Sequence, residues 1–205
     1  VDVSGSRHFG TLTQMKRDMM AEVAATLAFS TIANNDKVGV IFFSDKIEKF
    51  IPAQKGKTHV LHIIRELLSF EPSSTGTDIA QALQYFSNAQ KRHCTAFLIS
   101  DFIGVEGLEK PLMIASNRHE VNAIQIYDRR ETELPNVGLV KFHDAETGQH
   151  LWVDTAVASV REQYASEWKQ NQSRIEQLCT KTGVKRMSVR TDEDYVKALM
   201  KLFKS

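Results

Sequence analysis

Hydrophobic residues recur along this chain at two spacings, one typical of helices and one typical of strands. From residue 12 to residue 32 they fall every three or four positions with charged residues between them, which predicts an amphipathic helix packed on a sheet. Residues 38–43 form a nearly uninterrupted apolar run, as expected of a strand covered on both faces. A short edge strand over 47–51 should end at Pro52, which cannot donate a hydrogen bond to a sheet.

The same alternation continues as far as residue 127. Further helices are predicted over 58–69, from Ile79 through Phe86 and over 108–115, and further strands over 96–100 and 121–127. Strands that alternate with helices at this rhythm favour an α/β fold, with a doubly wound, mostly parallel sheet flanked by helices.

The pattern changes in the last third of the chain. Residues 138–142 and 151–153 are rich in apolar side chains and flank a polar turn that contains Gly148, so a β-hairpin is predicted. A long helix then follows from residue 157 and should end at Gly183. A short strand and a last helix complete this C-terminal elaboration.

No repeat, low-complexity tract or linker interrupts the chain, so a single domain is expected over 1–205, with 129–205 as its hairpin and helical elaboration. The first strand would contain only Val1, Asp2 and Val3. The central strand of such a sheet should bring several apolar residues before its first turn. We therefore expect that the start of this strand is missing and that the parent protein is longer.

The composition excludes several functional classes. The 205 residues are 42% hydrophobic and carry a net charge of only +1, with basic residues spread out, so nothing indicates binding to nucleic acid or to an anionic membrane. No apolar run approaches the ~18 residues of a membrane span, and no signal peptide precedes the first strand. Cys94 and Cys179 lack metal-type spacing and suit a reducing compartment, so a cytoplasmic location is expected.

The first residues carry the strongest functional signal. Asp2, Ser4 and Ser6 alternate directly after an apolar residue, and side chains two apart on a strand share a face. One carboxylate and two hydroxyls can therefore point at a common spot. Oxygen donors with a single negative charge suit Mg²⁺ better than zinc. Taken alone, the same residues could also cap a helix and fill a turn.

Two later segments carry matching chemistry. Thr77 lies between a Ser/Thr-rich loop and an apolar-periodic stretch, so we interpret it as a helix N-cap with its hydroxyl at the loop tip, and Asp78 as an acid in the first helical turn. Thr75 is the competing candidate. Asp101 follows a buried strand, where it could also be only a turn residue. Ligands of open parallel sheets bind beyond the C-terminal ends of the strands, so the three loops should converge.

Asp2-x-Ser4-x-Ser6, Thr77 and Asp101 together resemble the metal-ion-dependent adhesion site of von Willebrand factor A domains, in order and approximate spacing, over residues 1 to about 127. The resemblance implies that the three hydroxyl side chains contact the metal, Mg²⁺ or Mn²⁺, while the two aspartates lie mostly behind water or hydrogen bonds. It also implies that an Asp or Glu carboxylate of a partner protein completes the coordination.

Longer segments resemble a bacterial branch of these domains, the domain of unknown function 58 family. These segments are Leu27-Ala28-Phe29-Ser30, Asn35-Asp36-Lys37-Val38-Gly39, Phe43-Ser44-Asp45, Ile99-Ser100-Asp101-Phe102 and His143-Asp144-Ala145-Glu146-Thr147-Gly148. Members of this branch are typically encoded beside MoxR-type AAA+ ATPases. The resemblance therefore implies a metal-dependent protein-binding module that works with such an ATPase in the assembly or activation of other complexes.

Two further binding features are open to interpretation. Arg7 and His8 follow Ser6 and could attract an acidic partner to the metal, although such residues are also common as solvated loop charges. The alternative among binding functions is a metal-independent scaffold with a vestigial site, which would contact its ATPase through the turn at 144–148.

An enzyme is the principal alternative to a binding module. An aspartate at the end of the first strand, here Asp2, is also the nucleophile of one class of Mg²⁺-dependent phosphoryl-transfer enzymes. That chemistry usually needs a second acid two residues later, where this chain has Ser4, and no Gly-rich phosphate loop with a lysine follows the strand. The residues therefore favour a non-catalytic protein.

Overall fold

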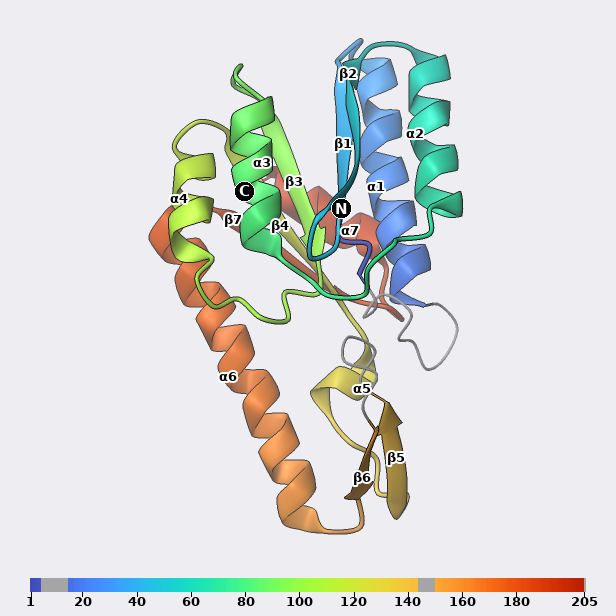
Figure 1. Ribbon diagram of the computed structural model, residues 1–205, viewed down its shortest axis with the longest axis vertical. Coiled ribbons are helices and arrows are strands. Elements are labelled where there is room, and N and C mark those ends of the chain that lie inside the picture. Colours follow the sequence, from blue (N-terminus) through green and yellow to red (C-terminus); the bar gives the residue numbers. More distant parts are fainter. Residues whose placement is uncertain (5–14, 144–149, 205) are drawn as a thin grey trace.

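Parallel strands form the centre of a mixed α/β fold (Figure 1). The computed structural model describes residues 1–4, 15–143 and 150–204. The central parallel sheet has the strand order β3-β4-β7 and consists of β3 (Thr95–Ser100), β4 (Glu120–Tyr127) and β7 (Lys185–Arg190). The α/β class with a parallel sheet flanked by helices, predicted from the alternating pattern, is thereby confirmed.

The N-terminal residues join this sheet to an antiparallel ladder of two strands, β1 (Val38–Phe43) and β2 (Ile47–Gln54). On one side, the Asp2 amide donates to the Ile99 carbonyl of β3 at 2.9 Å. On the other side, the Val3 amide donates to the Phe43 carbonyl of β1 at 2.8 Å, and Asp2 forms a parallel bridge with Phe43. The first residues of the chain therefore lie between β1 and β3.

Helices cover both faces of these strands (Figure 1). One face is covered by α1 (Lys16–Ala33), α2 (Lys57–Ser69) and α7 (Tyr195–Lys204), and the other by α3 (Ile79–Ala89), α4 (Glu109–Ser116) and the end of α6 (Ala158–Thr182). Successive residues of β3 show the division, because side chains alternate along a strand. Leu98 packs with α3, α4 and α6, whereas Ile99 packs with α1 and α7.

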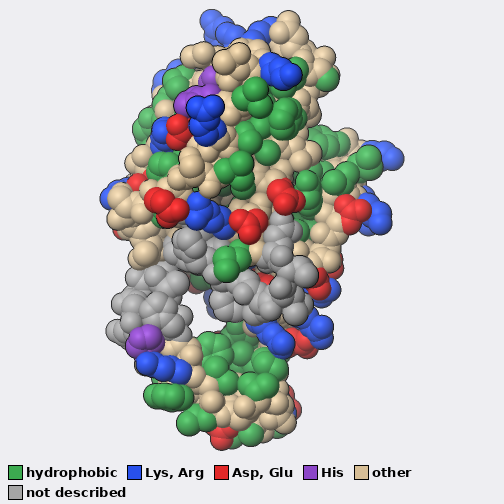
Figure 2. Space-filling view, turned by 90° about the vertical axis from the view of Figure 1, so that its right-hand side faces the viewer, with side chains coloured by type: hydrophobic (Ala, Val, Ile, Leu, Met, Phe, Trp, Pro, Cys, Tyr) green, Lys and Arg blue, Asp and Glu red, His purple; other side chains and the backbone are tan. Residues whose placement is uncertain are grey.

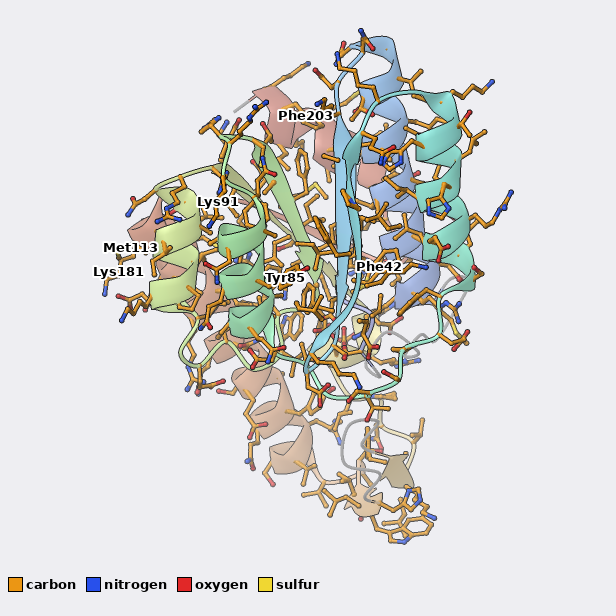
Figure 3. All side chains as sticks on the ribbon, turned by 45° about the horizontal axis from the view of Figure 1, so that its top comes forward. Phe42, Tyr85, Lys91, Met113, Lys181 and Phe203 are labelled. Atoms are coloured by element: carbon orange, nitrogen blue, oxygen red, sulfur yellow. The ribbon has the colours of Figure 1, made fainter. Side chains whose placement is uncertain are left out.

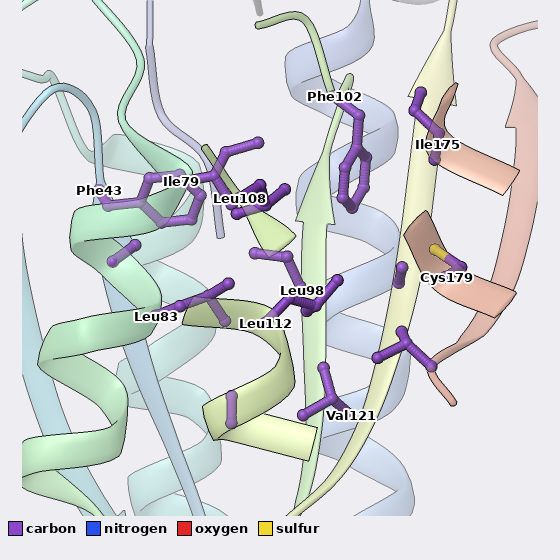
Figure 4. Packing of buried hydrophobic residues seen from close by; sticks show 14 residues of the cluster. Phe43, Ile79, Leu83, Leu98, Phe102, Leu108, Leu112, Val121, Ile175 and Cys179 are labelled. Atoms are coloured by element: carbon purple, nitrogen blue, oxygen red, sulfur yellow. The ribbon is translucent and has the colours of Figure 1, made fainter. Parts of the chain in front are cut away.

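Apolar contacts on both faces explain the long hydrophobic runs of the sequence. Figure 4 shows the cluster around Leu98, in which Leu112 of α4 and Ile175 of α6 converge on the sheet. Figure 3 shows Phe42 of β1 and Tyr85 of α3 at the antiparallel ladder. The Phe42 ring lies 5.0 Å from that of Phe70, and the Tyr85 ring lies 5.8 Å from that of Phe50 on β2.

A distal arm extends from the sheet (Figure 1). We use this name for the hairpin of β5 (Leu139–His143) and β6 (His150–Asp154) and the first part of α6, residues 158–171. The buried residues of α6 all lie nearer its other end, which terminates at Gly183 with a left-handed φ of 68°. The Tyr164 hydroxyl donates to the Arg130 carbonyl at 3.0 Å, and Trp168 lies against Tyr127. These contacts attach the arm, and the predicted hairpin and long helix are confirmed.

Two details differ from the sequence-based prediction. Pro52 does not end its strand, because β2 continues to Gln54. Within the described ranges this strand pairs only with β1, and its register shifts between Val38 and Val40, so the missing amide of Pro52 interrupts no ladder bond there. A one-turn helix, α5 (Arg129–Thr132), was not predicted at all.

Two further observations concern the cysteines and the helices of the described residues. Cys94 and Cys179 are both free thiols, as expected. Among the helices described, none combines the length and the apolar character needed to cross a bilayer.

Candidate metal centre

Asp2 is fixed at the junction of the two ladders, and only 2% of it is exposed. Its Oδ1 accepts a hydrogen bond from the Ser4 amide at 2.9 Å, and its Oδ2 accepts one from the Ser100 hydroxyl at 2.7 Å. The Ser4 side chain, which is fully buried, also hydrogen-bonds to the Asp2 carboxylate. The Asp2 carboxylate therefore organises the turn after the first strand.

Asp101 lies beside this turn, directly after β3, and is also buried. Its Oδ1 accepts a hydrogen bond from the Ile103 amide at 3.3 Å, and its carbonyl accepts one from the Gln125 side chain at 3.0 Å. The next residue, Phe102, adopts a left-handed φ of 57°. Such a backbone is costly for a bulky side chain, so the surrounding contacts must hold the Asp101 loop in place.

The charge of Asp101 affects the ionisation of Asp2. Burial and, to a smaller extent, the negative charge of Asp101 raise the pKa of Asp2 to about 6, although the hydrogen bonds from Ser100 and Ser4 lower it. Two buried carboxylates near each other repel when both are ionised. A positive charge nearby would offset this repulsion.

Lys16 supplies such a charge, although the sequence analysis did not single it out. Its ammonium is 0% exposed and donates to Asp101 Oδ2 at 2.8 Å and to Glu131 Oε1 at 2.5 Å. Burial lowers the pKa of Lys16, but the charges of Asp101 and Glu131 outweigh burial, so its pKa lies above the ordinary value. In the sequence, Lys16 is one of several charges at the start of an amphipathic helix and looks like a solvated one.

The short helix α5 positions Glu131. Its N-cap Asp128 accepts a hydrogen bond from the Arg130 amide at 2.8 Å, while Glu131 Oε2 accepts one from the Asp128 amide at 2.7 Å, which makes a capping box. Thr191 donates to the second Asp128 oxygen at 3.0 Å and ties α5 to the end of β7. The spacing of Asp128 and Glu131 is a recognisable capping signal, and it could have predicted this turn.

The loop with Thr77 lies next to the end of β1. The Asp78 amide donates to the Ser44 carbonyl at 2.8 Å, and a side chain at Gly76 would meet Asp45 at 3.3 Å, so the loop lies close against this strand end. The N-cap of α3 is Asp78 and not Thr77, because Asp78 Oδ1 accepts a hydrogen bond from the Gln81 amide at 2.8 Å. Both predictions for this pair were wrong by one position. Thr77 is half-buried just before the helix.

Glu48 of β2 fastens the same loop. Its carboxylate accepts hydrogen bonds from the Ser73 hydroxyl at 2.7 Å, from the Ser73 and Ser74 amides at 3.1 Å, and from the Ser44 hydroxyl at 2.8 Å. The hydrogen bonds of Glu48 join the loop before Thr77 to the turn between β1 and β2.

The structure thus brings Asp2, Ser4 and Asp101 together and places the Thr77 loop at a neighbouring strand end. Ser6, Arg7 and His8, the other predicted site residues, lie outside the described residues, as does the turn at 144–148. In the part of the chain that is described, no group of three or more His, Cys, Asp and Glu side chains could hold a metal ion.

Comparison with known proteins identifies the family to which this chain is similar. Residues 1–174 match the family described as "Protein of unknown function DUF58". Uncharacterized proteins of Mycobacterium tuberculosis and Mycobacterium bovis are 29% identical over 209 residues, which cover 100% of this chain and 65% of each relative. The chain therefore spans slightly less than two thirds of these relatives. An uncharacterized protein of Mycobacterium avium is 29% identical over 159 residues, 76% of this chain and 92% of that protein.

Solved structures share the fold. The structure described as the conserved hypothetical protein BatB of Bacteroides thetaiotaomicron aligns with a TM-score of 0.60 at 18% identity, over 100% of this chain and 96% of that one. An aerotolerance-related membrane protein of Bacteroides fragilis aligns with a TM-score of 0.65 at 17% identity, with the same coverage. At these identities the likeness concerns the fold alone, whereas the match over residues 1–174 shows that the chain belongs to the DUF58 family of proteins of unknown function.

Proposed function

We propose that this chain is a non-catalytic, metal-dependent protein-binding module of the von Willebrand factor A type, with a doubly wound sheet and a metal-ion-dependent adhesion site. One observation carries the proposal. Asp2 and Asp101, from opposite ends of the candidate motif, are both buried at the strand ends, and the negative charge of Asp101 raises the pKa of Asp2. Open α/β sheets bind their ligands at this edge.

The donor set fits a magnesium ion. Ser4, Ser6 and Thr77 would hold Mg²⁺ or Mn²⁺ through their hydroxyls, and Asp101 would act behind water. Asp2 already accepts hydrogen bonds on both oxygens, from the Ser4 amide and the Ser100 hydroxyl, so it would act by orienting the turn. When bound, a cation with largely neutral ligands attracts an Asp or Glu carboxylate of a partner. Arg7 and His8 would add positive charge near that carboxylate.

The same contacts speak against the phosphoryl-transfer alternative. A nucleophilic aspartate needs a free oxygen that a phosphate can approach. Both oxygens of Asp2 are engaged, and the residue is almost wholly buried. Ser4, at the position of the general acid, is itself buried and bonded to Asp2. This environment favours an organising role for Asp2.

The partner proposal rests on the family resemblance. A MoxR-type AAA+ ATPase is the proposed partner in the assembly or activation of other complexes. The same proposal includes a cytoplasmic location. The metal site would then be one of the surfaces through which client proteins are held.

Titration with Mn²⁺ alone tests the metal site. We expect the wild type to bind one ion, and Ser4→Ala combined with Ser6→Ala to lose binding while the fold is retained. Thr77→Ala should weaken binding at least about tenfold, because a direct ligand is lost. Thr75→Ala, in the same loop, is the matched control and should bind as the wild type does. Equal binding by all variants, or none by the wild type, would refute the proposed site.

A metal-independent scaffold is the second candidate function, and the distal arm favours it. Leu139, Leu151 and Trp152 of the hairpin are 64%, 66% and 61% exposed. In Figure 2, hydrophobic side chains gather on the lower lobe that contains this hairpin. Exposed apolar clusters of this kind commonly mark protein contacts. Capture of the ATPase that persists in chelator but fails for Trp152→Ser would favour the scaffold.

A further inference from the structure

Lys16 is a buried cation whose role the proposed site does not yet explain. It lies in the first turn of α1, where a long lysine side chain can usually reach water. Instead its ammonium is fully buried between Asp101 and Glu131. Replacing a buried ion pair by apolar residues of similar size is often neutral or stabilising, so a buried pair is weak evidence for a stabilising role. The position of the Lys16 ammonium beside Asp101 suggests an electrostatic function.

Among the described residues, the contacts show which charges surround Asp101. Asp101 and Glu131 each hydrogen-bond to Lys16, and Asp2 lies close enough to Asp101 for the two carboxylates to repel. Without Lys16, the surroundings would carry one more net negative charge. Such a site would attract a divalent cation more strongly and would leave that cation less attractive to an incoming carboxylate.

We propose that Lys16 sets the balance between these two affinities: it lowers the affinity of the site for the metal ion and raises the affinity of the metal-loaded site for an acidic ligand. Glu131 opposes Lys16 in both effects. The inference rests on the proposed function, which it deepens by assigning the preference for an anionic partner to a residue outside the adhesion motif. Lys16 is a positioning residue in this account because it acts through Asp101.

A set of charge variants tests this inference with Mn²⁺ and acetate as probes. Lys16→Met should bind Mn²⁺ roughly tenfold more tightly, since a unit charge is removed a few ångströms from the site in a partly buried environment. Glu131→Gln should bind Mn²⁺ more weakly by a similar factor. The double variant Lys16→Met/Glu131→Gln should lie near the wild type. The affinity of the Mn²⁺-loaded protein for acetate, measured by water-proton relaxation, should follow the reverse order. It should be lowest for Lys16→Met and highest for Glu131→Gln.

A purely structural role predicts a different result. Both single variants disturb the same buried cluster, so lost packing would weaken Mn²⁺ binding in both, whereas the charge account moves them in opposite directions. Lys49→Met is the matched control, because it breaks a more exposed ion pair between Lys49 on β2 and Glu66 on α2. It should leave both affinities unchanged.

The outcomes separate the two proposals. Absence of Mn²⁺ binding by the wild type overturns the proposed function and this inference with it. Binding by the wild type, with Lys16→Met weaker or unchanged, overturns the inference alone. Should Lys16→Met fail to fold, Glu131→Gln still decides through acetate, because the charge account requires its Mn²⁺-loaded form to bind acetate more tightly than the wild type does. Equal or weaker acetate binding by this variant, or tighter or equal Mn²⁺ binding, contradicts the charge account.

Discussion

The sheet edge and the distal arm differ in which kinds of side chain they bury and which they expose. At the sheet edge, Lys16, Asp2 and Asp101 are charged groups withdrawn from water, each with hydrogen-bond partners. On the arm, Leu139 and Trp152 are apolar groups left in water. Neither arrangement is what stability alone would select. The two candidate binding regions therefore depart from the usual burial rules in opposite directions, and each can be tested separately.

The largest expected effect contrasts the same substitution in the two regions. Leu112→Ala removes a side chain that is 1% exposed and packs between α4 and the sheet, so it should lower the free energy of unfolding by about 2–5 kcal/mol. Leu151→Ala on the arm should change it by less than about 0.5 kcal/mol. Denaturant unfolding measures both. Similar losses for the two variants would mean that the arm is packed in solution, and the comparison would fail.

A smaller loss is expected where a hydroxyl supports the site. Ser100→Ala removes the hydrogen bond to Asp2 and the acceptor of the Phe102 amide, so it should cost about 1–3 kcal/mol. Ser116→Ala removes only an exposed hydrogen bond to the Met113 carbonyl and serves as the control, with an expected change below about 0.5 kcal/mol. Thermal unfolding in chelator compares the two without any contribution from metal.

Substitutions of Asp78 and Thr77 at the start of α3 should separate an effect on stability from an effect on metal binding. Asp78→Ala removes the N-cap of α3 and should cost about 1 kcal/mol. Thr77→Ala leaves this cap in place but should lose far more Mn²⁺ affinity than Asp78→Ala does. An unchanged free energy of unfolding for Asp78→Ala would show that the assignment of the cap is wrong.

The smallest effect is expected on the arm. Trp152→Ser should leave the unfolding free energy within about 0.5 kcal/mol of the wild type and the Mn²⁺ affinity unchanged, because the side chain is largely solvated. A change in Mn²⁺ affinity would show that the hairpin and the sheet edge are coupled, contrary to their separation here.

Much of the fold could be predicted because it depends on local patterning. The strand at 38–43, the helix over 58–69 and the end of the long helix at Gly183 follow from apolar spacing and from a residue that tolerates positive φ. The family could be recognised from short segments and was confirmed over residues 1–174. The metal site stays a prediction, although the structure places Asp2 and Asp101 together as it requires.

Other features could not be predicted because their causes are not local. Pro52 remains inside β2 because the ladder shifts register there. Lys16 is buried because Asp101 and Glu131, 85 and 115 residues away in sequence, meet its ammonium. Nothing in the sequence near Lys16 distinguishes it from a solvated lysine.

Side-chain periodicity and backbone preference, which can be read from the chain alone, specify which segments become strands and helices and which oxygen-bearing residues end the strands. Which charges share a buried environment follows from packing in three dimensions, because electrostatic interaction depends on distance and solvent exclusion and not on chain order. The pairing of Lys16 with Asp101 is the clearest product of that second step.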